Sequence, residues 1–302
     1  MAPGLQENRS YFSTRRTGSI GTIGFRDAVI LQDNEGRRYN ERAVSQELRL
    51  MCVLAHPDDE SLGTGGALAR YSAEGVGTYV VTATRGQRGR FDDKGTKPGP
   101  EIVGRTREGE LRAAARELGV REVVLFDYMD AELDAVDPVA ASEAIARQIR
   151  RIKPQVVVTF DPFGAYGHPD HIAISQLTGA ALTRAADEHQ VSKFYYFVNG
   201  ERKWAAYQAA FKQLTSNVDG TVRVATAWPD WSITTKVDAR DMWQTVWRAV
   251  QCHKTQMSIY RNIGNLTEDD QRVIWGTGEF YRVFTRVNGG REVETDLFQG
   301  IR

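Results

Sequence analysis

The chain has 302 residues, of which 41% are hydrophobic and 26% charged, which is typical of a folded globular protein with one large or two small domains. Lysine plus arginine equals aspartate plus glutamate, with 39 of each, so the formal net charge is zero. This balance gives no electrostatic basis for binding nucleic acid or an anionic membrane. No apolar stretch approaches the roughly 20 residues that span a bilayer, and two cysteines are too few for a disulfide framework or a cysteine zinc site.

The N-terminal part of the chain differs in composition from the rest. Residues 1–47 are rich in Arg, Asn, Gly and Ser and contain only a weak strand pattern at 28–31. We expect an arm or small β appendage there, followed by one domain over residues 48–302. The polar start has no secretion signal, and Arg15-Arg16 lacks the apolar segment of a twin-arginine signal. These features favour a cytoplasmic protein.

From residue 48 onward, short apolar or β-branched runs alternate with helical patterns. The predicted strands are 48–55, 78–84, 122–126, 155–160 and 193–198. The predicted helices between them are 63–74, 107–118, 138–152 and 170–188. Such alternation is typical of an α/β fold, and it predicts a doubly wound, mostly parallel, Rossmann-like sheet with helices on both faces.

Two further segments complete the pattern. Residues 86–104 are dense in Gly, Pro and charge, which predicts a long loop, and loops of this length are commonly functional. Following a strand end, this loop is expected to gate or shape a site. The last hundred residues are less regular, with a predicted strand at 234–237 and a helix at 241–257, so we expect an irregular C-terminal part.

Two similar polar motifs follow the first and fourth predicted strands. One reads Ala-His-Pro-Asp-Asp-Glu at 55–60, and the other reads Tyr-Gly-His-Pro-Asp-His at 166–171. Proline disfavours helical backbone in the residue before it, so each preceding histidine is held extended. Parallel sheets bind ligands beyond the carboxyl ends of their strands, where the two motifs would converge. Two histidines and a carboxylate around an open position form a catalytic zinc arrangement.

Two other interpretations of these patterns compete with a metal site. Either motif alone is as consistent with a histidine satisfied by its local surroundings as with a metal ligand, whereas the pair favours a metal. A nucleotide-binding interpretation of Gly63-Thr64-Gly65-Gly66 is weaker, because the Gly-x-Gly-x-x-Gly order and a suitably placed acidic partner are missing.

The two motifs together resemble those of the zinc-dependent N-deacetylases called the LmbE-like or PIG-L family. The resemblance extends from residue 48 to about residue 260. Its more modest signatures are Gly109-Glu110-Leu111-Arg112, Leu118-Gly119-Val120, Tyr128-Met129-Asp130 and His253-Lys254-Thr255-Gln256. It implies hydrolysis of an N-acyl bond, with acetyl as the first expectation, on an amino sugar or sugar conjugate. It also implies one Zn²⁺ per chain.

The resemblance assigns the metal and the base to particular positions. By matching motif positions, it implies that His56, Asp59 and His171 are the zinc ligands. It implies that Asp58 is the general base that takes a proton from water. These roles are chemically consistent, because zinc lowers the pKa of bound water to about 7 and an adjacent carboxylate can accept the released proton.

The second motif is expected to supply the remaining catalytic groups. The resemblance implies that His168 is a charged donor that stabilises the oxyanion and protonates the leaving amine. Asp170 would orient a neighbouring imidazole, and Tyr166 would polarise the substrate carbonyl. Amide cleavage requires such an acid, because the nitrogen leaves as an amine.

Three further residues are candidate substrate contacts. Arg85 and Arg88 follow the second predicted strand, where they would hold a sugar hydroxyl or an anionic group, or else lie in a solvated turn. His253 follows a predicted helix that bears Trp243 and Trp247. Packing of His253 against the core is slightly favoured, while the resemblance suggests that it lies near the site.

Two alternative functions stay open from the sequence. One is an amidase that cleaves a larger thiol–sugar amide conjugate, and the other is a non-catalytic metal-binding scaffold of the same fold. Asp58 and His168 argue against the scaffold, because a structural zinc site is closed by four protein ligands and needs neither. The expected partner is a small N-acylated sugar-type molecule, and assembly into a homo-oligomer stays open.

Overall fold

The computed structural model describes residues 30–32, 38–40, 47–92, 94–211, 215–218, 220–290 and 292–302. By their contacts, residues 1–46 and 47–302 are two separate units. In the first, β1 (Ile30–Gln32) pairs antiparallel with β2 (Arg38–Asn40), and β1 overlaps the weak strand pattern at 28–31. The rest of the expected N-terminal arm lies outside the described residues, and the expected domain boundary stays a prediction.

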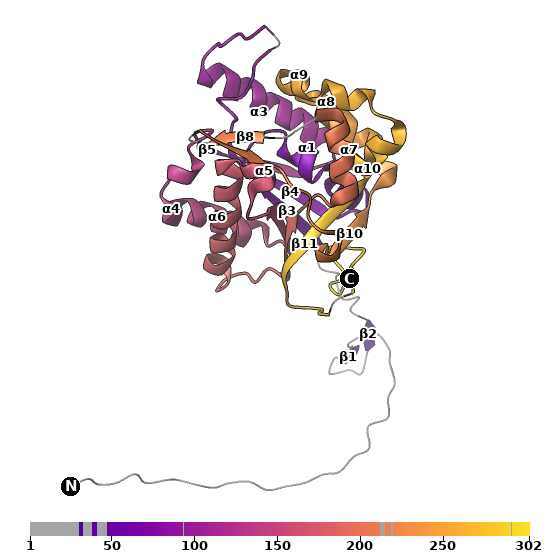
Figure 1. Cartoon of the computed structure of the whole chain (residues 1–302). Helices are drawn as coiled ribbons and strands as arrows, with labels where there is room; N and C mark the ends of the chain where they lie inside the picture. Colours follow the sequence, from indigo (N-terminus) through magenta and orange to yellow (C-terminus); the bar gives the residue numbers. More distant parts are fainter. Residues whose placement is uncertain are drawn as a thin grey trace, which may run out of the picture. The chain divides into compact units, whose positions relative to one another are not determined.

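The second unit is built around a seven-stranded sheet (Figure 1). Its strands are β3 (Arg49–Leu54), β4 (Gly77–Thr84), β5 (Glu122–Tyr128), β6 (Val156–Phe160), β7 (Lys193–Phe197), β10 (Thr235–Asp238) and β11 (Thr277–Thr285). They lie in the order β10-β11-β7-β6-β3-β4-β5. Strands β3 to β7 pair in parallel, while β11 pairs antiparallel with β7 and β10. The predicted mostly parallel α/β fold is confirmed.

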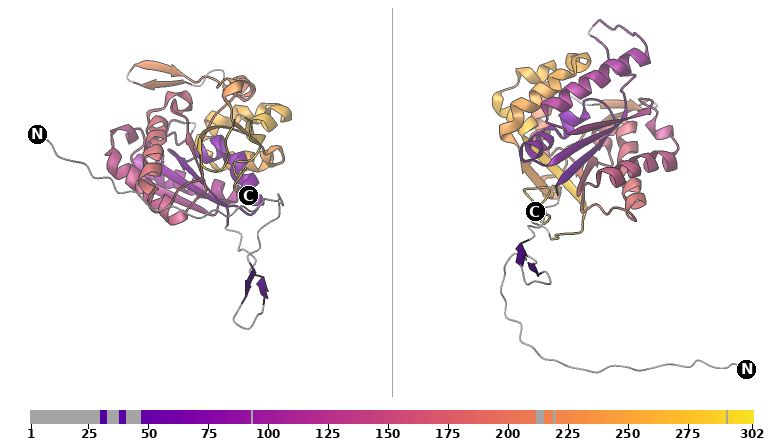
Figure 2. Two further views of the ribbon diagram at one scale, coloured as in Figure 1. Left: turned by 90° about the horizontal axis from the view of Figure 1, so that it is seen from below. Right: turned by 180° about the vertical axis from the view of Figure 1, so that it is seen from behind.

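Helices cover both faces of this sheet (Figure 2). On one side α4 (Pro138–Ile152) packs against α6 (Pro169–Ala185). On the other, α8 (Trp243–Cys252) packs against α2 (Gly65–Ala73) and α3 (Pro100–Glu117). Because both faces are covered, the central strands are continuous apolar runs, and all eight residues of β4 are buried. No helix in the described parts of the chain is long and apolar enough to cross a membrane.

The strand order fixes where a ligand site can form. From β3 the chain moves outward through β4 to β5, and then returns to β6 on the other side of β3. Such a reversal leaves a crevice beyond the carboxyl ends of the two central strands. Strand β3 ends at Leu54 and β6 ends at Phe160, so both His-Pro-Asp motifs follow strands that border this crevice.

Several element boundaries differ from the predictions. Helix α3 begins at Pro100 rather than at residue 107, because proline at the first helical position sacrifices no hydrogen bond. The predicted loop therefore ends at Gly99, whose φ of 98° favours glycine. The predicted helix at 63–74 is two helices, α1 (Asp59–Gly63) and α2.

The C-terminal part is more regular than expected. Strand β11 lies where the sequence pattern looked irregular, because Glu279 and Arg282 interrupt its apolar residues. The predicted helix at 241–257 is the shorter helix α8, with a 3₁₀ turn on either side. Helix α9 (Met257–Tyr260), which follows, is a single turn. Helices α7 (Glu201–Phe211) and α10 (Glu268–Gly276) pack against each other.

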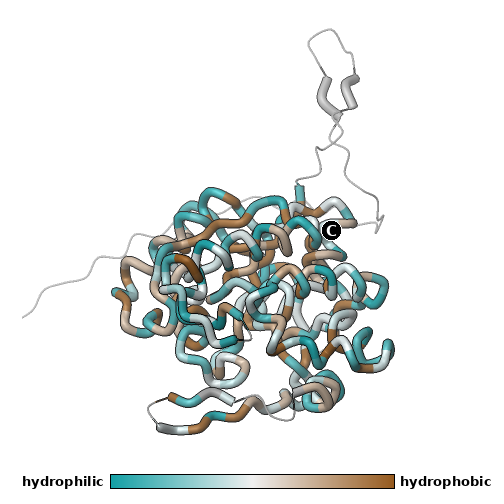
Figure 3. Tube along the Cα trace, turned by 90° about the horizontal axis from the view of Figure 1, so that it is seen from above, coloured by the Kyte–Doolittle hydropathy of each residue, from teal (hydrophilic) through white to brown (hydrophobic). Residues whose placement is uncertain are grey.

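A two-stranded hairpin projects from the compact unit (Figure 2, left). It consists of β8 (Thr215–Val218) and β9 (Thr221–Val224), paired antiparallel. Val222 and Val224 are exposed, and Figure 3 shows apolar stretches along the hairpin. Arg223 Nη1 donates to the carbonyl oxygen of Gly167 at 3.1 Å, which ties the hairpin to the second histidine motif.

A buried carboxylate fastens the C-terminal segment to the sheet. Glu294 is 1% exposed and accepts hydrogen bonds from Lys193 Nζ at 2.6 Å, the Tyr195 hydroxyl at 2.7 Å and the Thr235 hydroxyl at 2.8 Å. Arg282 Nη1 lies 2.7 Å from it. Burial alone would raise the pKa of Glu294, but the hydrogen bond from Lys193 and those from its other partners outweigh burial and lower the pKa to about 2. The ionised form is therefore the one that joins β7, β10 and β11.

We expect Glu294→Gln to lower the free energy of unfolding at pH 7 by about 3–5 kcal/mol, because it leaves the buried Lys193 ammonium without its ionised partner. The native pKa is depressed, so this stabilisation is complete above about pH 4.5 and is lost as the pH falls toward 2. Urea unfolding at pH 7 and pH 3 measures both effects. Glu292→Gln, an exposed change in the same segment, is the control, and an equal loss in both variants would contradict the assignment.

A candidate metal centre at the switch point of the sheet

Three predicted ligands meet at the crevice between β3 and β6. His56 Nδ1 lies 3.1 Å from His171 Nε2. Asp59 Oδ2 lies 3.8 Å from His56 Nδ1, and Asp59 Oδ1 lies 3.6 Å from His171 Nε2. Ligands at about 2.0–2.2 Å from a tetrahedral zinc ion are roughly 3.3–3.6 Å apart, so the three groups are spaced to share one small cation.

The local chain path fixes each of these side chains. Asp59 lies in the first turn of α1, and its Oδ2 accepts the backbone N–H groups of Ala55 at 3.1 Å and His56 at 2.7 Å. His171 lies in the first turn of α6, where its ring stacks on Phe160 with a centroid distance of 3.9 Å. All three predicted ligands are at least nine-tenths buried.

The hydrogen bonds behind the two rings decide which nitrogens are free. His56 Nε2 lies 3.1 Å from both Asp130 Oδ1 and Asp170 Oδ2, so it must carry the proton that faces them. His171 Nδ1 lies 3.3 Å from the carbonyl oxygen of Gly164 and is likewise the donor. When His56 is neutral, its Nδ1 therefore directs a lone pair to the same point as the lone pair of His171 Nε2. A proton on His56 Nδ1 would let that ring donate to His171 Nε2, and a metal ion in the place of that proton would be bound by both lone pairs, so the residues fit a divalent metal ion.

The electrostatics of the pocket agree with this fit. Burial lowers the pKa of His56, but hydrogen bonds with Asp130 and Asp170 outweigh it and raise the pKa to about 10. The two carboxylates thus stabilise positive charge on this ring, whether from a proton or from a bound cation. Burial raises the pKa of Asp59 to about 7, and the nearby Asp58 adds to this effect.

His168 also approaches the centre. One ring nitrogen from each of His168, His56 and His171 lies within 4.8 Å of the other two, so His168 is an alternative third ligand. Its Nδ1 accepts the backbone N–H of Asp170 at 3.2 Å, so the neutral ring carries its proton on Nε2. Burial and the neighbouring His56 lower the pKa of His168. Asp59 is the better third ligand, because it supplies negative charge and places one oxygen toward each of the other two.

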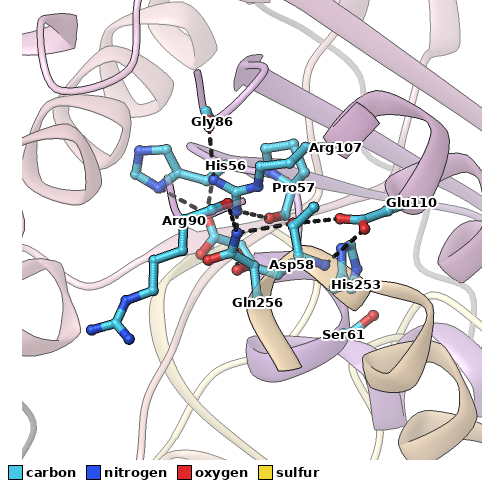
Figure 4. Close-up of polar contacts among 12 residues, drawn as sticks. His56, Pro57, Asp58, Ser61, Gly86, Arg90, Arg107, Glu110, His253 and Gln256 are labelled. Atoms are coloured by element: carbon cyan, nitrogen blue, oxygen red, sulfur yellow. Dashed lines mark hydrogen bonds and ion pairs between the residues drawn. The ribbon is translucent and has the colours of Figure 1, made fainter. Parts of the chain in front are cut away.

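Asp58 lines the cavity, and only one of its two carboxylate oxygens accepts hydrogen bonds from neighbouring side chains. Arg107 Nη2 donates to Asp58 Oδ2 at 3.1 Å (Figure 4). The Tyr260 hydroxyl donates to the same atom at 2.9 Å. Asp58 Oδ1 has no hydrogen-bond partner among the described residues. Asp58, Arg107 and Tyr260 all line the cavity that contains the candidate ligands.

Arg107 and Tyr260 are site residues that the sequence did not reveal. The guanidinium of Arg107 is buried and also donates to the carbonyl oxygens of Gly86 at 3.0 Å and Pro57 at 2.5 Å. A Cβ atom on Gly86 would lie 2.0 Å from Arg107 Nη1, and one on Gly89 would lie 2.3 Å from it. The pair of glycines after β4 was the available signal, because it leaves room for a side chain from elsewhere.

The cavity itself has a volume of about 460 Å³. Beyond the candidate ligands, its wall includes Tyr166, Phe197, Asn199, Thr215, Tyr207 and Gln256. The Tyr166 ring centroid lies 5.3 Å from that of His171, so the predicted carbonyl donor borders the metal position. Apolar rings with a few polar groups are typical of a small-molecule site.

Of the two arginines predicted to contact substrate, only Arg88 lies at the cavity. Arg88 lines the cavity and pairs with Glu132. Arg85 does not reach the cavity, because its guanidinium pairs with Glu108 and Asp127. The proposed substrate contact at Arg85 is therefore not supported by its position.

Two predicted residues lie behind the cavity wall. Asp170 is fully buried and holds the imidazole of His56, as expected of a residue that orients a ring. His253 is also fully buried, and its Nε2 lies 2.7 Å from Glu60 Oε1. A direct substrate contact for His253 therefore does not fit the geometry.

Comparison with known sequences agrees with this site. Residues 51–182 match the PIG-L family, described as GlcNAc-PI de-N-acetylase. The chain is 31% identical to the 1D-myo-inositol 2-acetamido-2-deoxy-alpha-D-glucopyranoside deacetylase of Kineococcus radiotolerans, over 85% of this chain and 84% of that protein. It is 32% identical to the protein of the same name from Nocardiopsis dassonvillei, over 83% of this chain and all of that protein. The chain belongs to the PIG-L family.

Solved structures share the fold of this PIG-L family member. The conserved protein TT1542 from Thermus thermophilus has a TM-score of 0.57 at 24% identity, covering 80% of this chain and 97% of that one. The N,N'-diacetylchitobiose deacetylase from Pyrococcus horikoshii has a TM-score of 0.58 at 19% identity, covering 80% and 86%. GalB, the 4-carboxy-2-hydroxymuconate hydratase of Pseudomonas putida, has a TM-score of 0.58 at 21% identity, covering 80% and 99%. Because a hydratase shares the fold, function must be argued from the site.

We expect Asp59→Ala and His171→Ala to lose most of the bound metal after dialysis, whereas His168→Ala retains it, because only the first two remove a ligand. Elemental analysis of each purified variant measures the metal per chain. His189→Ala is the control, because that side chain contacts the carbonyl oxygen of Pro154 instead of the cavity. If His168→Ala loses the metal and Asp59→Ala keeps it, His168 is the third ligand.

Proposed function

We propose that this chain hydrolyses the N-acetyl group of an N-acetylglucosaminyl conjugate, with inositol as the aglycone and one zinc ion per chain. The observation that carries this proposal is the free oxygen of Asp58 in the same cavity as His56, Asp59 and His171. The inositol conjugate follows from the curated relatives, which align with more than four-fifths of this chain.

The metal would be held by His56 Nδ1, His171 Nε2 and the carboxylate of Asp59. A zinc ion in such a site polarises a carbonyl group as a Lewis acid and lowers the pKa of water from 15.7 to roughly 7. Asp130, Asp170 and the carbonyl oxygen of Gly164 hold the two rings in the tautomers that ligation requires.

Asp58 is suited to accept a proton from the attacking water. Its Oδ2 is held by Arg107 and Tyr260, so the carboxylate is fixed while Oδ1 stays available. A base that is already held in the reactive orientation avoids the entropic cost of reaching that orientation during the reaction. The proton thus moves to Oδ1, and the Arg107 guanidinium balances the charge of the carboxylate before the transfer.

His168 and Tyr166 are suited to act as donors on the substrate side. With His168 Nδ1 accepting a backbone N–H, the ring is neutral and Nε2–H can donate a hydrogen bond to the oxyanion, while the proton that Asp58 takes from the water is the one that can pass to the leaving amine. Burial raises the pKa of Tyr166, so its hydroxyl stays protonated and can donate to the carbonyl oxygen. Donors that meet the developing oxyanion are among the largest contributions to acyl-transfer catalysis.

The wall of the cavity supports a sugar as the group that carries the amide. Asn199, Gln256 and Arg88 offer donors and acceptors for hydroxyl groups, and Phe197 offers an apolar face. A larger thiol–sugar amide is the competing substrate, and the two are separated by comparing them directly. The scaffold alternative is disfavoured, because it would need neither the free oxygen of Asp58 nor the proton on His168.

Release of acetate and free amine from N-acetylglucosaminyl inositol tests the proposal, with free N-acetylglucosamine and a thiol–sugar amide as competitors. We expect the inositol conjugate to have the highest kcat/KM, and a chelator to abolish turnover until zinc is restored. Equal or higher kcat/KM for the thiol–sugar amide would reassign the substrate.

We expect Asp58→Asn to lower kcat by about 10²–10⁴-fold, because it removes the proton acceptor while keeping the shape of the side chain. Metal content should not change. Asp127→Asn, at an exposed aspartate that pairs with Arg85, is the control and should retain native kcat. Near-native kcat in Asp58→Asn would exclude Asp58 as the base.

A further inference from the structure

The backbone of Asp58 is held in an unusual conformation. Its φ is 117° and its ψ is −27°, in a region that residues with a Cβ atom rarely adopt. The residue nevertheless lies where β3 gives way to α1, and its carbonyl oxygen accepts the N–H groups of Ser61 and Leu62, both at 3.0 Å. Something must hold this conformation, because an unrestrained aspartate would relax to negative φ.

A buried carboxylate two residues away provides that restraint. Glu60 Oε2 accepts the backbone N–H of Asp58 at 2.9 Å. Glu60 is fully buried, so its other oxygen also needs donors, and it receives one from the Ser61 hydroxyl at 2.6 Å. The second comes from His253 Nε2 at 2.7 Å, from a residue that follows α8 and is 193 positions distant in the chain.

The burial of His253 is energetically unfavourable for one of its two ring nitrogens. Its side chain is fully buried, and its Nδ1 has no hydrogen-bond partner among the described residues. A buried polar atom without a partner is unfavourable, and an apolar side chain would fill the same space without that penalty. The single donor that His253 delivers to Glu60 is therefore what its imidazole adds to the structure.

We propose that Glu60 and His253 form a buried clamp that holds the Asp58 backbone at positive φ and so positions the carboxylate of Asp58 for catalysis. They are positioning residues, since neither lines the cavity. Arg107 and Tyr260 hold the carboxylate end of Asp58, and the clamp holds its backbone end. The proposal rests on the proposed function, in which Asp58 is the base.

The competing interpretation is that the pair only fastens α8 to α1. Fastening predicts a loss of stability without a selective loss of turnover. The clamp predicts that kcat falls while KM and metal content stay close to native, because His56, Asp59 and His171 keep the hydrogen bonds that hold them. These two patterns can be separated by steady-state kinetics together with elemental analysis.

The first test is His253→Phe, which keeps a buried ring but removes the donor. We expect kcat to fall by roughly 10²-fold, as is typical when a catalytic group is displaced by about 1 Å. His253→Gln restores a donor to Glu60 and should recover most of the lost kcat. Ser61→Ala removes the other donor without adding volume and should lower kcat in the same direction, so the test stands even if His253→Phe folds poorly.

Thr255→Val is the matched control. Its hydroxyl donates to Glu110 at 2.7 Å and accepts from Gln256 Nε2 at 3.0 Å, so the change removes two buried hydrogen bonds from the same segment without touching Glu60 or Asp58, and Gln256 Nε2 still donates to the carbonyl oxygen of Arg90 at 2.8 Å. We expect some loss of thermal stability but native kcat. Equal kcat losses in Thr255→Val and His253→Phe would overturn the clamp in favour of simple fastening.

A double variant tests whether His253 acts through Asp58. In the Asp58→Asn background the base is already lost, so adding His253→Phe should cause no further fall in kcat. A full additional 10²-fold loss would show that His253 acts by another route and would overturn the proposal.

A crystal structure of His253→Phe gives a readout that does not depend on turnover. We expect the φ of Asp58 to relax to a negative value, and a retained positive φ would overturn the clamp. If the native protein hydrolyses none of the amide substrates, the proposed function fails, whereas the backbone of Asp58 in this variant still decides the clamp.

Discussion

The site depends on the meeting of two imidazole nitrogens that both present lone pairs. His56 Nδ1 and His171 Nε2 are 3.1 Å apart, and the groups behind them prevent either ring from turning its proton inward. Asp130 and Asp170 occupy one side of His56, and a backbone carbonyl occupies the far side of His171. A positive charge between the two nitrogens, from a proton or from a metal ion, makes this arrangement favourable, so the metal-binding role follows from the hydrogen bonds behind the ligands as much as from the ligands themselves.

The carboxylates behind His56 come from separate parts of the fold. Asp130 follows β5, whereas Asp170 belongs to α6 and accepts the N–H groups of Ala131 at 2.7 Å and Leu133 at 3.0 Å. The segment after β5 is thereby fixed to the start of α6, directly behind the ring. Three strand ends of the parallel sheet thus contribute to one cluster, which only the switch-point order β6-β3-β4-β5 brings together.

Backbone strain is concentrated in the same place. Four described residues other than glycine have positive φ, and three of them line the cavity: Asp58, Ala131 and Ala165. The fourth, Lys153, only ends helix α4. Each such residue costs about 1–3 kcal/mol, and persists only where the surroundings hold it. The hydrogen bonds of Glu60, Asp161 and Asp170 to these segments provide that support.

The sequence by itself determined the fold class, the parallel core and the two motifs that supply the ligands, because alternating apolar runs and proline-fixed histidines are local patterns. It did not reveal β11, whose charged residues hide an otherwise apolar strand, or the start of α3. Only the tertiary structure shows that Asp58 contacts Arg107, Tyr260 and Glu60, and that Glu60 contacts His253. Only the tertiary structure shows that Arg85 pairs with Glu108 and Asp127 outside the cavity. Those contacts connect residues as far as 202 positions apart, and such pairings depend on how the helices pack on the sheet rather than on any spacing along the chain.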